Sequence, residues 1–351
     1  MERSSLHING TVYDAKRVVE EWISHPPVWK QKGWEFIIQL LDPSDTRIRF
    51  HTSGTTGPPK TIHFSKKQVI YSAENTSAFF RLSSVDHLLL CLPAEFVAGR
   101  LMMARVLVSG ASLTWLEPAL NPLADIDSHD ISFAAFTPAQ VATILNNDDT
   151  REKFSKIRQV IIGGGEISTQ LETELATFPH AIYATYGMTE TLTHVAVRKI
   201  GESVYQGVYK DVIFSTNESD CLVIDLPFIS NTPILTKDVV EIITPGSFRW
   251  KGRLDHVINT GGIKLYAEEL EKKIVQAGIL DVQRFYISSK ADPVFGQSPV
   301  IVLLKGGHEK DTAALLTRIN GVLNKHESIK HVVFFDKFDF TETGKLKRLK
   351  F

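Results

Sequence analysis

The segment Thr52-Ser53-Gly54-Thr55-Thr56-Gly57-Pro58-Pro59-Lys60 combines hydroxyl side chains, two glycines and a lysine. Glycine lets backbone N–H groups come close to an anion, hydroxyls add donors, and lysine adds positive charge. This combination is typical of a loop that binds a polyphosphate, although a simple turn between two strands has a similar composition. It is not a Walker A loop, because that pattern requires glycine where Pro59 stands.

Downstream of this loop, short apolar runs alternate with helical patterns between residues 85 and 183. Strands are expected at 87–92, 112–116, 131–136, 159–162 and 181–183, and helices at 100–108, 138–146 and 169–177. Thr137 and Pro138 fit the N-cap and first turn of the second helix. The alternation predicts an α/β fold, in which a mostly parallel sheet carries helices on its faces.

The pattern changes after residue 195. Between 195 and 243, β-branched residues and breaks at Asn and Pro predict a small antiparallel β region. From about residue 252, helices at 267–277 and 311–325 and strands at 282–288, 299–304 and 332–335 predict a small α+β domain. We therefore expect a shortened large N-terminal domain at 1–252 and a small C-terminal domain at 253–351.

Charge and composition argue against several classes of protein. The 351 residues carry 39 basic and 40 acidic side chains, so no overall basic field attracts nucleic acid or an anionic membrane. We see neither an apolar run of the ~20 residues that span a bilayer nor a secretory signal, and we expect a cytoplasmic protein. Cys91 and Cys221 match no redox or zinc pattern, and Cys91, within an apolar run, is expected to be a buried thiol.

Five further segments follow the loop in order. They are Gly163-Gly164-Gly165-Glu166, Tyr186-Gly187-Met188-Thr189-Glu190, Thr236-Lys237-Asp238, Gly252-Arg253-Leu254-Asp255 with Gly261-Gly262 after it, and Thr343-Gly344-Lys345-Leu346-Lys347-Arg348. Together with the loop, they resemble the motifs of the adenylate-forming superfamily, which contains acyl-CoA synthetases, adenylation domains and luciferases. The resemblance extends from about residue 50 to the last residue of the chain.

The resemblance implies an ATP site. Asp238 would accept hydrogen bonds from both ribose hydroxyls, Thr189 would contact phosphate, and Glu190 would hold Mg²⁺, for which a carboxylate oxygen is a suitable ligand. The remaining residues implied in nucleotide binding are Thr52, Ser53, Gly54, Thr55, Thr56, Gly57 and Lys60 around the phosphates, Gly163, Gly164, Gly165, Tyr186 and Gly187 around the adenine, and Arg253.

The resemblance also implies an activity, the ATP-dependent joining of a small carboxylic acid to CoA through an acyl-AMP intermediate. Lys345 would be the catalytic residue that bridges the acid and the α-phosphate. The small domain would then rotate about Asp255 and bring Gly261 and Gly262 to the channel for CoA. The expected ligands are therefore ATP, Mg²⁺, CoA and the acid, with no nucleic acid and no membrane insertion, and the chain is compatible with a homodimer.

Two segments bear on the acid. Residues 92–99 (Leu-Pro-Ala-Glu-Phe-Val-Ala-Gly) and 136–140 (Phe-Thr-Pro-Ala-Gln) are similar to those of superfamily members that act on o-succinylbenzoate, a dicarboxylic acid of menaquinone biosynthesis. By resemblance, Arg105 would meet one carboxylate of that acid; Arg100 is a nearby competitor, and an arginine on the outer face of a helix is the alternative. Phe96 stands where relatives often carry histidine, at the junction of the acid pocket and the CoA tunnel, and it cannot donate a hydrogen bond.

Other functions fit the same motifs. The acid could be another aryl or medium-chain acid, or the acceptor could be a carrier protein in place of CoA. A non-catalytic nucleotide sensor is the alternative from a different class. The joint presence of Lys60, Glu190, Asp238, Arg253 and Lys345 favours an enzyme.

Overall fold

Short parallel strands in the middle of the chain form the centre of a large sheet, as the sequence predicts. The computed structural model describes residues 5–44, 47–51, 61–126, 130–306, 311–340 and 346–351. Its parallel strands, in sheet order, are β6 (Ser112–Trp115), β5 (His87–Leu90), β7 (Phe133–Phe136), β8 (Gln159–Ile162) and β9 (Ala181–Gly187). All of β7 is buried, which is the pattern of a strand covered on both faces.

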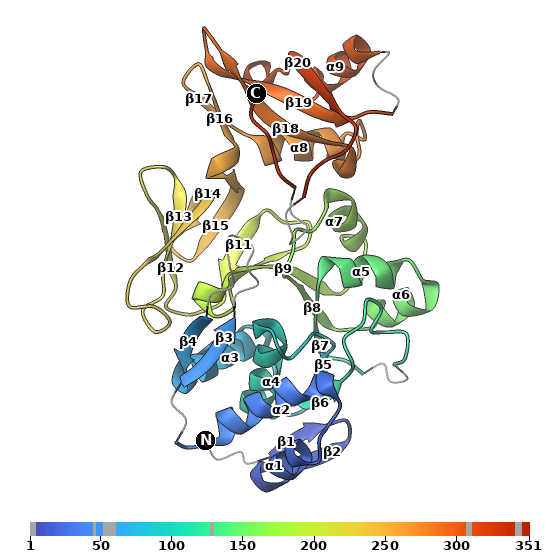
Figure 1. Cartoon of the computed structure of the whole chain (residues 1–351), viewed down its shortest axis with the longest axis vertical. Helices are drawn as coiled ribbons and strands as arrows, with labels where there is room; N and C mark the ends of the chain where they lie inside the picture. Colours follow the sequence, from blue (N-terminus) through green and yellow to red (C-terminus); the bar gives the residue numbers. More distant parts are fainter. Residues whose placement is uncertain (1–4, 45–46, 52–60, 127–129, 307–310, 341–345) are drawn as a thin grey trace.

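Helices cover these strands on both faces (Figure 1). They are α3 (Lys66–Phe80), α4 (Val97–Ser109), α5 (Pro138–Leu145), α6 (Asp148–Ser155) and α7 (Thr169–Leu175). The start of α5 confirms the predicted cap: the Thr137 hydroxyl accepts a hydrogen bond from the N–H of Gln140, and Pro138 occupies the first turn.

Alternate residues of the parallel strands enter different cores. Leu88 and Leu90 of β5 pack in the core that contains α4. Leu89 and the neighbouring Cys91 pack in the core that contains α5, α6 and α7. Cys91 is thus the buried thiol that the sequence predicts, and burial raises the pKa of that thiol well above its usual range.

The N-terminal elements extend one edge of the sheet. Strand β1 (Ser5–Ile8) runs parallel to β6, and β2 (Thr11–Asp14) pairs antiparallel with β1. Helices α1 (Ala15–Ile23) and α2 (Val28–Leu41) follow. Strands β3 (Arg47–His51) and β4 (Thr61–Ser65) then form a separate antiparallel pair, so the residues before and after the segment 52–60 lie opposite each other.

Antiparallel strands extend the other edge of the sheet. In sheet order they are β10 (His194–Lys199), β11 (Val204–Gly207), β15 (Ser247–Arg253), β14 (Ile234–Thr244), β13 (Cys221–Asp225) and β12 (Ile213–Thr216). The antiparallel arrangement confirms the prediction, but these strands are not a separate unit. Strand β10 is buried along most of its length and pairs directly with β9, so thirteen strands of the described residues form one sheet.

A second sheet follows Arg253. It contains β17 (Ile263–Tyr266), β16 (Val257–Thr260), β19 (Gly296–Leu304), β18 (Phe285–Asp292) and β20 (His331–Phe335), with α8 (Ala267–Gln276) and α9 (Thr312–Asn320). In Figure 1 it lies at the opposite end of the molecule from β1 and β2. In the described parts of the chain, no helix is long and apolar enough to cross a bilayer.

Two predicted boundaries in this region were wrong. Residues 282–284 form a 3₁₀ turn, and the strand begins at Phe285. Helix α9 ends at Asn320 and not near residue 325, because Gly321, a poor helix former, occupies the C-cap.

Candidate functional site

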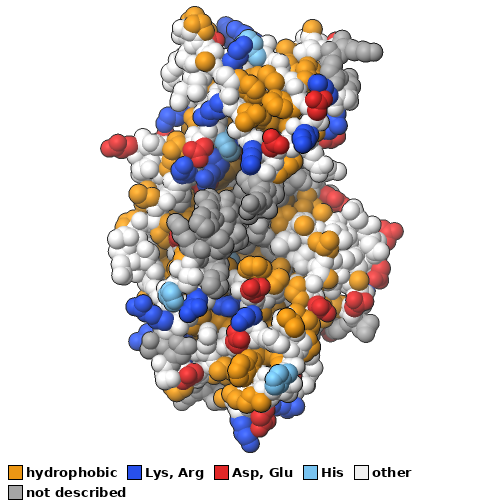
Figure 2. Space-filling view, in the orientation of Figure 1, with side chains coloured by type: hydrophobic (Ala, Val, Ile, Leu, Met, Phe, Trp, Pro, Cys, Tyr) orange, Lys and Arg blue, Asp and Glu red, His pale blue; other side chains and the backbone are white. Residues whose placement is uncertain are grey.

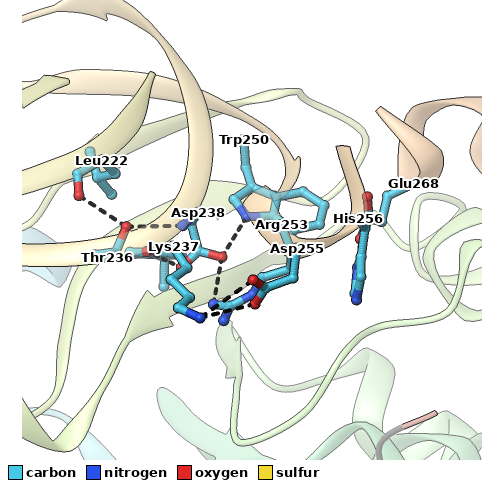
Figure 3. Close-up of polar contacts among 10 residues, drawn as sticks. Leu222, Thr236, Lys237, Asp238, Trp250, Arg253, Asp255, His256 and Glu268 are labelled. Atoms are coloured by element: carbon cyan, nitrogen blue, oxygen red, sulfur yellow. Dashed lines mark hydrogen bonds and ion pairs between the residues drawn. The ribbon is translucent and has the colours of Figure 1, made fainter. Parts of the chain in front are cut away.

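The carboxylate of Asp238 is the point where the nucleotide motifs meet. Asp238 lies on β14 and is only 9% exposed. Its Oδ2 accepts the Tyr186 hydroxyl at 2.7 Å, and its Oδ1 accepts Nε1 of Trp250 and Nη1 of Arg253, both at 3.2 Å. Figure 3 shows Trp250 and Arg253 approaching Asp238 from the neighbouring strand. The structure therefore brings together Tyr186, Asp238 and Arg253, three residues predicted for the site.

Thr236 fixes the backbone that carries Asp238. The N–H of Asp238 donates to Oγ1 of Thr236 at 3.1 Å, and the Thr236 hydroxyl donates to the carbonyl of Leu222 at 2.9 Å (Figure 3). The Thr236 hydroxyl thus accepts a hydrogen bond from a backbone N–H of β14 and donates one to a backbone carbonyl of β13. This explains in physical terms why the motif needs threonine at its first position.

Trp250 is a site residue that the sequence analysis missed. It lies on β15, where Arg253 is opposite Asp238 and Trp250 is opposite Val240. A register shift between these pairs adds one residue to β15, and this bulge puts the Trp250 side chain on the same side as Arg253. Strict alternation would put residues 250 and 253 on opposite faces of a strand, so no spacing in the sequence predicts Trp250 as a partner of Asp238.

Tyr186 has an aromatic surrounding. Its ring lies edge-on to Phe248 at 5.2 Å between centroids, and to Tyr205 at 5.9 Å. Burial and the nearby Asp238 carboxylate raise the pKa of the Tyr186 hydroxyl well above its usual range. The hydroxyl is therefore a permanent donor, and an aromatic wall suits the face of a purine base.

Close approaches explain two of the predicted glycines, and a positive φ explains a third. A Cβ on Gly163 would lie 2.2 Å from Oγ1 of Thr185, and one on Gly187 would lie 2.3 Å from the carbonyl oxygen of Thr193. Gly164 has φ of +79°, a conformation that favours glycine. Gly165 is exposed, and a Cβ there would make only ordinary contacts with Pro138. These glycines leave open backbone at the carboxyl end of β8, where ligands bind in open α/β sheets.

Thr189 and Glu190 lie on a 3₁₀ turn, Thr189–Thr191, directly after β9. The buried Thr191 hydroxyl secures this turn by bonding to the carbonyls of Met188 at 2.9 Å and Thr193 at 2.6 Å. Glu190 is exposed, so its carboxylate is open to a ligand. A hard oxygen donor of this kind fits Mg²⁺, which is held in proteins by one or two carboxylates together with substrate phosphates.

The C-terminal residues 346–351 are fastened to the second sheet. Arg348 forms a two-pronged ion pair with Glu271 of α8, with Nη2 at 2.8 Å from Oε2. The N–H of Phe351 donates to the Ser289 carbonyl at 2.9 Å. Although burial alone would lower the pKa of Arg348, the Glu271 carboxylate and the charge of Glu166 raise it. Glu166 follows the glycine turn, so Arg348 is within electrostatic range of a residue next to that turn.

The loop residues Thr52, Ser53, Gly54, Thr55, Thr56, Gly57 and Lys60 lie outside the described residues, and so does Lys345. The flanking positions are described. His51 pairs with Thr61 across the β3–β4 hairpin, and Phe340 forms an antiparallel bridge with Leu346.

The residues predicted for domain rotation and for CoA lie at the start of the second sheet. Asp255 pairs with Lys237 at 3.3 Å, and both side chains are more than half exposed; such a pair contributes little to stability. Gly261 and Gly262 form the two-residue turn between β16 and β17, with φ of +55° and +84°. Positive φ at both positions is the requirement of a type I′ hairpin turn, which favours glycine.

Arg105 lies inside the molecule. It is 1% exposed, on a helix whose residues are mostly buried, so the outer-face alternative is wrong. Its Nε has no hydrogen-bond partner among the described residues. Burial lowers the pKa of Arg105 to about 10, so the guanidinium is charged at neutral pH. An enclosed cation of this kind requires an anion that the described protein does not supply.

The groups around Arg105 are neutral. His194 was missed by the sequence analysis; its Nε2 lies 3.3 Å from the hydroxyl of Thr76, and burial together with the charge of Arg105 lowers its pKa well below the usual range. Tyr209 donates its hydroxyl to Ser72 at 2.8 Å, and burial raises its pKa to about 12. The imidazole and the hydroxyls can share hydrogen bonds but leave the charge of Arg105 uncompensated.

Arg100 and Phe96 are in other surroundings. Arg100 donates from Nε to the carbonyl of Ala94 at 3.1 Å and from Nη1 to that of Arg49 at 2.6 Å. Its donors are thus partly used by the protein, unlike Nε of Arg105. Phe96 is the N-cap of α4 and is 47% exposed. It therefore lies at the surface and not in the enclosed surroundings of Arg105.

Comparison with known proteins identifies the family of this chain. The family model described as AMP-binding enzyme matches residues 2–213. The 2-succinylbenzoate–CoA ligase of Haemophilus influenzae is 25% identical over 272 residues, which are 72% of this chain and 58% of that protein. The indoleacetate–CoA ligase of Aromatoleum aromaticum is 22% identical over 363 residues, 93% of this chain and 71% of that protein.

A solved structure extends the likeness to the fold. The acyl-CoA synthetase (AMP-forming)/AMP-acid ligase II-like protein of Dyadobacter fermentans superposes with a TM-score of 0.65 at 29% identity, covering 92% of this chain and 93% of that one. The chain spans just over half the length of the Haemophilus relative. The family model nevertheless covers more than half of this chain, and the chain belongs to the AMP-binding enzyme family.

Proposed function

We propose that the protein is an ATP-dependent, AMP-forming acid–CoA ligase. The observation that carries the proposal is the set of three donors, Tyr186, Trp250 and Arg253, that hold the nearly buried carboxylate of Asp238. These donors fill three of the roughly four acceptor positions of a carboxylate, so one ribose hydroxyl can donate to the open position and the second can take the place of one of the three donors. The aromatic groups beside it and the open backbone at Gly163–Gly165 supply the apolar surface that adenine needs.

The chemistry explains why an acid needs ATP. A carboxylate resists attack by a thiol, because its charge repels the nucleophile and oxide is a poor leaving group. In the first half-reaction, an oxygen of the acid attacks the α-phosphorus of ATP and pyrophosphate leaves, which produces acyl-AMP. Since charge gathers on phosphate oxygens in the transition state, catalysis consists mainly of positioning and electrostatic stabilisation.

Residues of this chain divide that task. The segment 52–60 grips the departing pyrophosphate, and Lys345 bridges the acid carboxylate and the α-phosphate. Thr189 contacts phosphate, and Glu190 would hold Mg²⁺, which would neutralise charge on the phosphate oxygens. Arg253 keeps Asp238 oriented through its 3.2 Å contact.

The second half-reaction forms the thioester. The CoA thiolate attacks the acyl carbonyl, and AMP leaves with the electrons of the broken C–O bond. We propose that residues 253–351 act as a mobile domain relative to residues 1–252 and turn about Asp255. The exposed Lys237–Asp255 pair is weak enough to break in such a rotation. The turn at Gly261 and Gly262 then lines the pantetheine channel.

The buried Arg105 supports a dicarboxylic acid as the substrate. One carboxylate would pair with the guanidinium, which has no described partner at Nε, while the other is activated by ATP. The 2-succinylbenzoate–CoA ligase named among the relatives acts on an acid with two carboxylates, so we favour o-succinylbenzoate. Because an indoleacetate–CoA ligase is also among the relatives, a monocarboxylic aryl acid is the alternative substrate. We place this activity in the cytoplasm, where ATP and CoA are available.

A panel of acids tests the proposal. Pyrophosphate release is followed with ATP, Mg²⁺ and each acid, and the thioester is identified by mass after CoA is added. We expect release with o-succinylbenzoate to exceed release with benzoate, indoleacetate and octanoate. Nucleotide binding without pyrophosphate release from any acid would indicate a sensor. Release followed by loading of a carrier protein, but not of CoA, would indicate the carrier-dependent alternative.

A further inference from the structure

A basic hollow of about 360 Å³ lies outside the site around Asp238. This basic hollow opens between α2, the β3–β4 hairpin and the residues at the start of α4. Its charged lining residues are Lys32, Arg47, Arg49, His63 and Arg100, against Glu35 and Glu95. Four cations and two anions leave a charge of +2 with the histidine neutral. Figure 2 shows lysine, arginine and histidine side chains gathered over this hairpin.

The hairpin aims its cations outward by strand alternation. Ile48 and Phe50 point into the core, so Arg49 points to the hollow. Arg49 lies directly opposite His63 in the β3–β4 register. Two basic side chains in that position repel each other whenever the histidine is protonated. No described residue forms a hydrogen bond or ion pair with the side chain of either one.

Arg100 forms the floor of the hollow. Its guanidinium lies 5.7 Å from the ring centre of Phe36 and 5.5 Å from that of Phe50, and its two hydrogen bonds go to backbone carbonyls. The charge is therefore held in a fixed place without a carboxylate at ion-pair distance among the described residues. A fixed guanidinium beside the outward Arg49 is suited to phosphate oxygens.

We propose that the basic hollow binds the phosphates at the nucleotide end of CoA. The inference rests on the proposed function, in which CoA is the acceptor of the acyl group. CoA carries a diphosphate and a 3′-phosphate far from its thiol, so they need cations away from the reacting carbonyl. The hollow shares no residue with the site around Asp238, so the phosphates of CoA and the ribose of the acyl-AMP would not compete for the same side chains.

Comparison of CoA with pantetheine, the same thiol without phosphates, tests this proposal. For Arg49→Glu we expect KM for CoA to rise roughly tenfold or more, because the variant loses at least one charge-assisted contact with a phosphate. KM for pantetheine and pyrophosphate release without thiol should stay unchanged. Arg318→Glu, an exposed arginine on α9, is the matched control. An equal effect on CoA and pantetheine, or an effect on KM for ATP, would overturn the assignment.

A binding measurement separates this inference from the proposed function. Adenosine 3′,5′-bisphosphate carries the phosphates but no thiol, and calorimetry follows its binding without any turnover. Wild type should bind it, inorganic phosphate should compete, and Arg49→Glu should abolish binding while circular dichroism stays unchanged. Absence of binding to wild type refutes the basic hollow as a phosphate site. If wild type binds the bisphosphate but forms no thioester from any acid, the ligase activity is refuted and the phosphate site is not.

Discussion

The Tyr186 hydroxyl donates to Oδ2 of Asp238 across 2.7 Å, although the two residues belong to strands four places apart in the sheet. In a flat sheet such strands lie about 19 Å apart, farther than these two side chains can reach. The antiparallel end of the sheet therefore curls and brings β14 toward β9. The nucleotide site is a product of this curvature, because it joins a motif after a parallel strand to motifs on an antiparallel hairpin.

Removal of the charge of Asp238 should weaken nucleotide binding. Asp238→Asn keeps the size of the side chain but presents one acceptor oxygen to Tyr186, Trp250 and Arg253. We expect KM for ATP to rise ~10-fold to 100-fold, because a hydrogen bond to a charged group contributes ~1.5–3 kcal/mol. Steady-state pyrophosphate release measures it. Glu241→Gln, on the same strand but paired with Arg249 in a half-exposed place, should behave as wild type; an equal rise in both variants would contradict the role of Asp238.

The sequence predicts individual helices and strands better than the contacts between distant ones. The parallel strands, the Thr137 cap and the antiparallel character of residues 195–243 follow from periodicity and turn chemistry, which act over a few residues. The resemblance to the adenylate-forming superfamily also implied that Tyr186, Asp238 and Arg253 would share a site. Trp250 was not predictable in the same way, because its contact depends on strand register and on the curl of the sheet.

The acid-binding prediction shows the same limit. Arg105 stands within Leu-Met-Met-Ala-Arg-Val-Leu-Val, a helix apolar on every side, and that pattern already indicates burial. The neighbouring His194 belongs to β10, eighty-nine positions later, and no local pattern links it to α4. Long-range packing decides which neutral groups surround a buried cation, and sequence spacing does not report it.

Arg105 should lower the free energy of unfolding of the protein when no acid is bound. Its pKa is lowered in the folded protein, so folding disfavours the charged form at every pH below about 10, and the lowering corresponds to about 3 kcal/mol. We expect Arg105→Met to unfold at a higher temperature than wild type, with a gain of ~1–3 kcal/mol. Preference for o-succinylbenzoate over benzoate should fall at the same time. Arg100→Met, which leaves two carbonyls without donors, should be destabilised; a stabilised Arg100→Met with an unchanged Arg105→Met would refute this account.

His194 should make the protein less stable in acid. Burial, and then the charge of Arg105, lowers its pKa in the folded state, so below about pH 6.5 the unfolded chain takes up a proton that the folded protein refuses. Stability is thus present above that pH and is lost as pH falls. Between pH 7.5 and 5.5 this one group accounts for on the order of 1 kcal/mol. Urea unfolding should show that loss reduced in His194→Gln and unchanged in His7→Gln, an exposed histidine of β1; parallel curves for wild type and His194→Gln would contradict it.

The ion pair between Arg348 and Glu271 should act on the first half-reaction alone. It fastens residues 346–351 to α8, directly after Lys345, and Glu271 also accepts the N–H of Ile287 at 2.6 Å. Loss of one partner of a buried pair costs ~3–5 kcal/mol, so in Glu271→Gln residues 346–351 are held less firmly, by their backbone contacts with Ser289 and Phe340.

Glu271→Gln should therefore slow pyrophosphate release at least tenfold, and Lys345→Ala should nearly abolish it, whereas both convert supplied acyl-AMP and CoA to thioester at rates near wild type. Lys272→Gln, an exposed change on the same helix, should leave both steps intact. Rapid-quench measurement of each half-reaction distinguishes the outcomes. If Lys345→Ala lost both half-reactions equally, Lys345 would serve folding or general binding, and the assignment of adenylation chemistry to the C-terminal segment would fail.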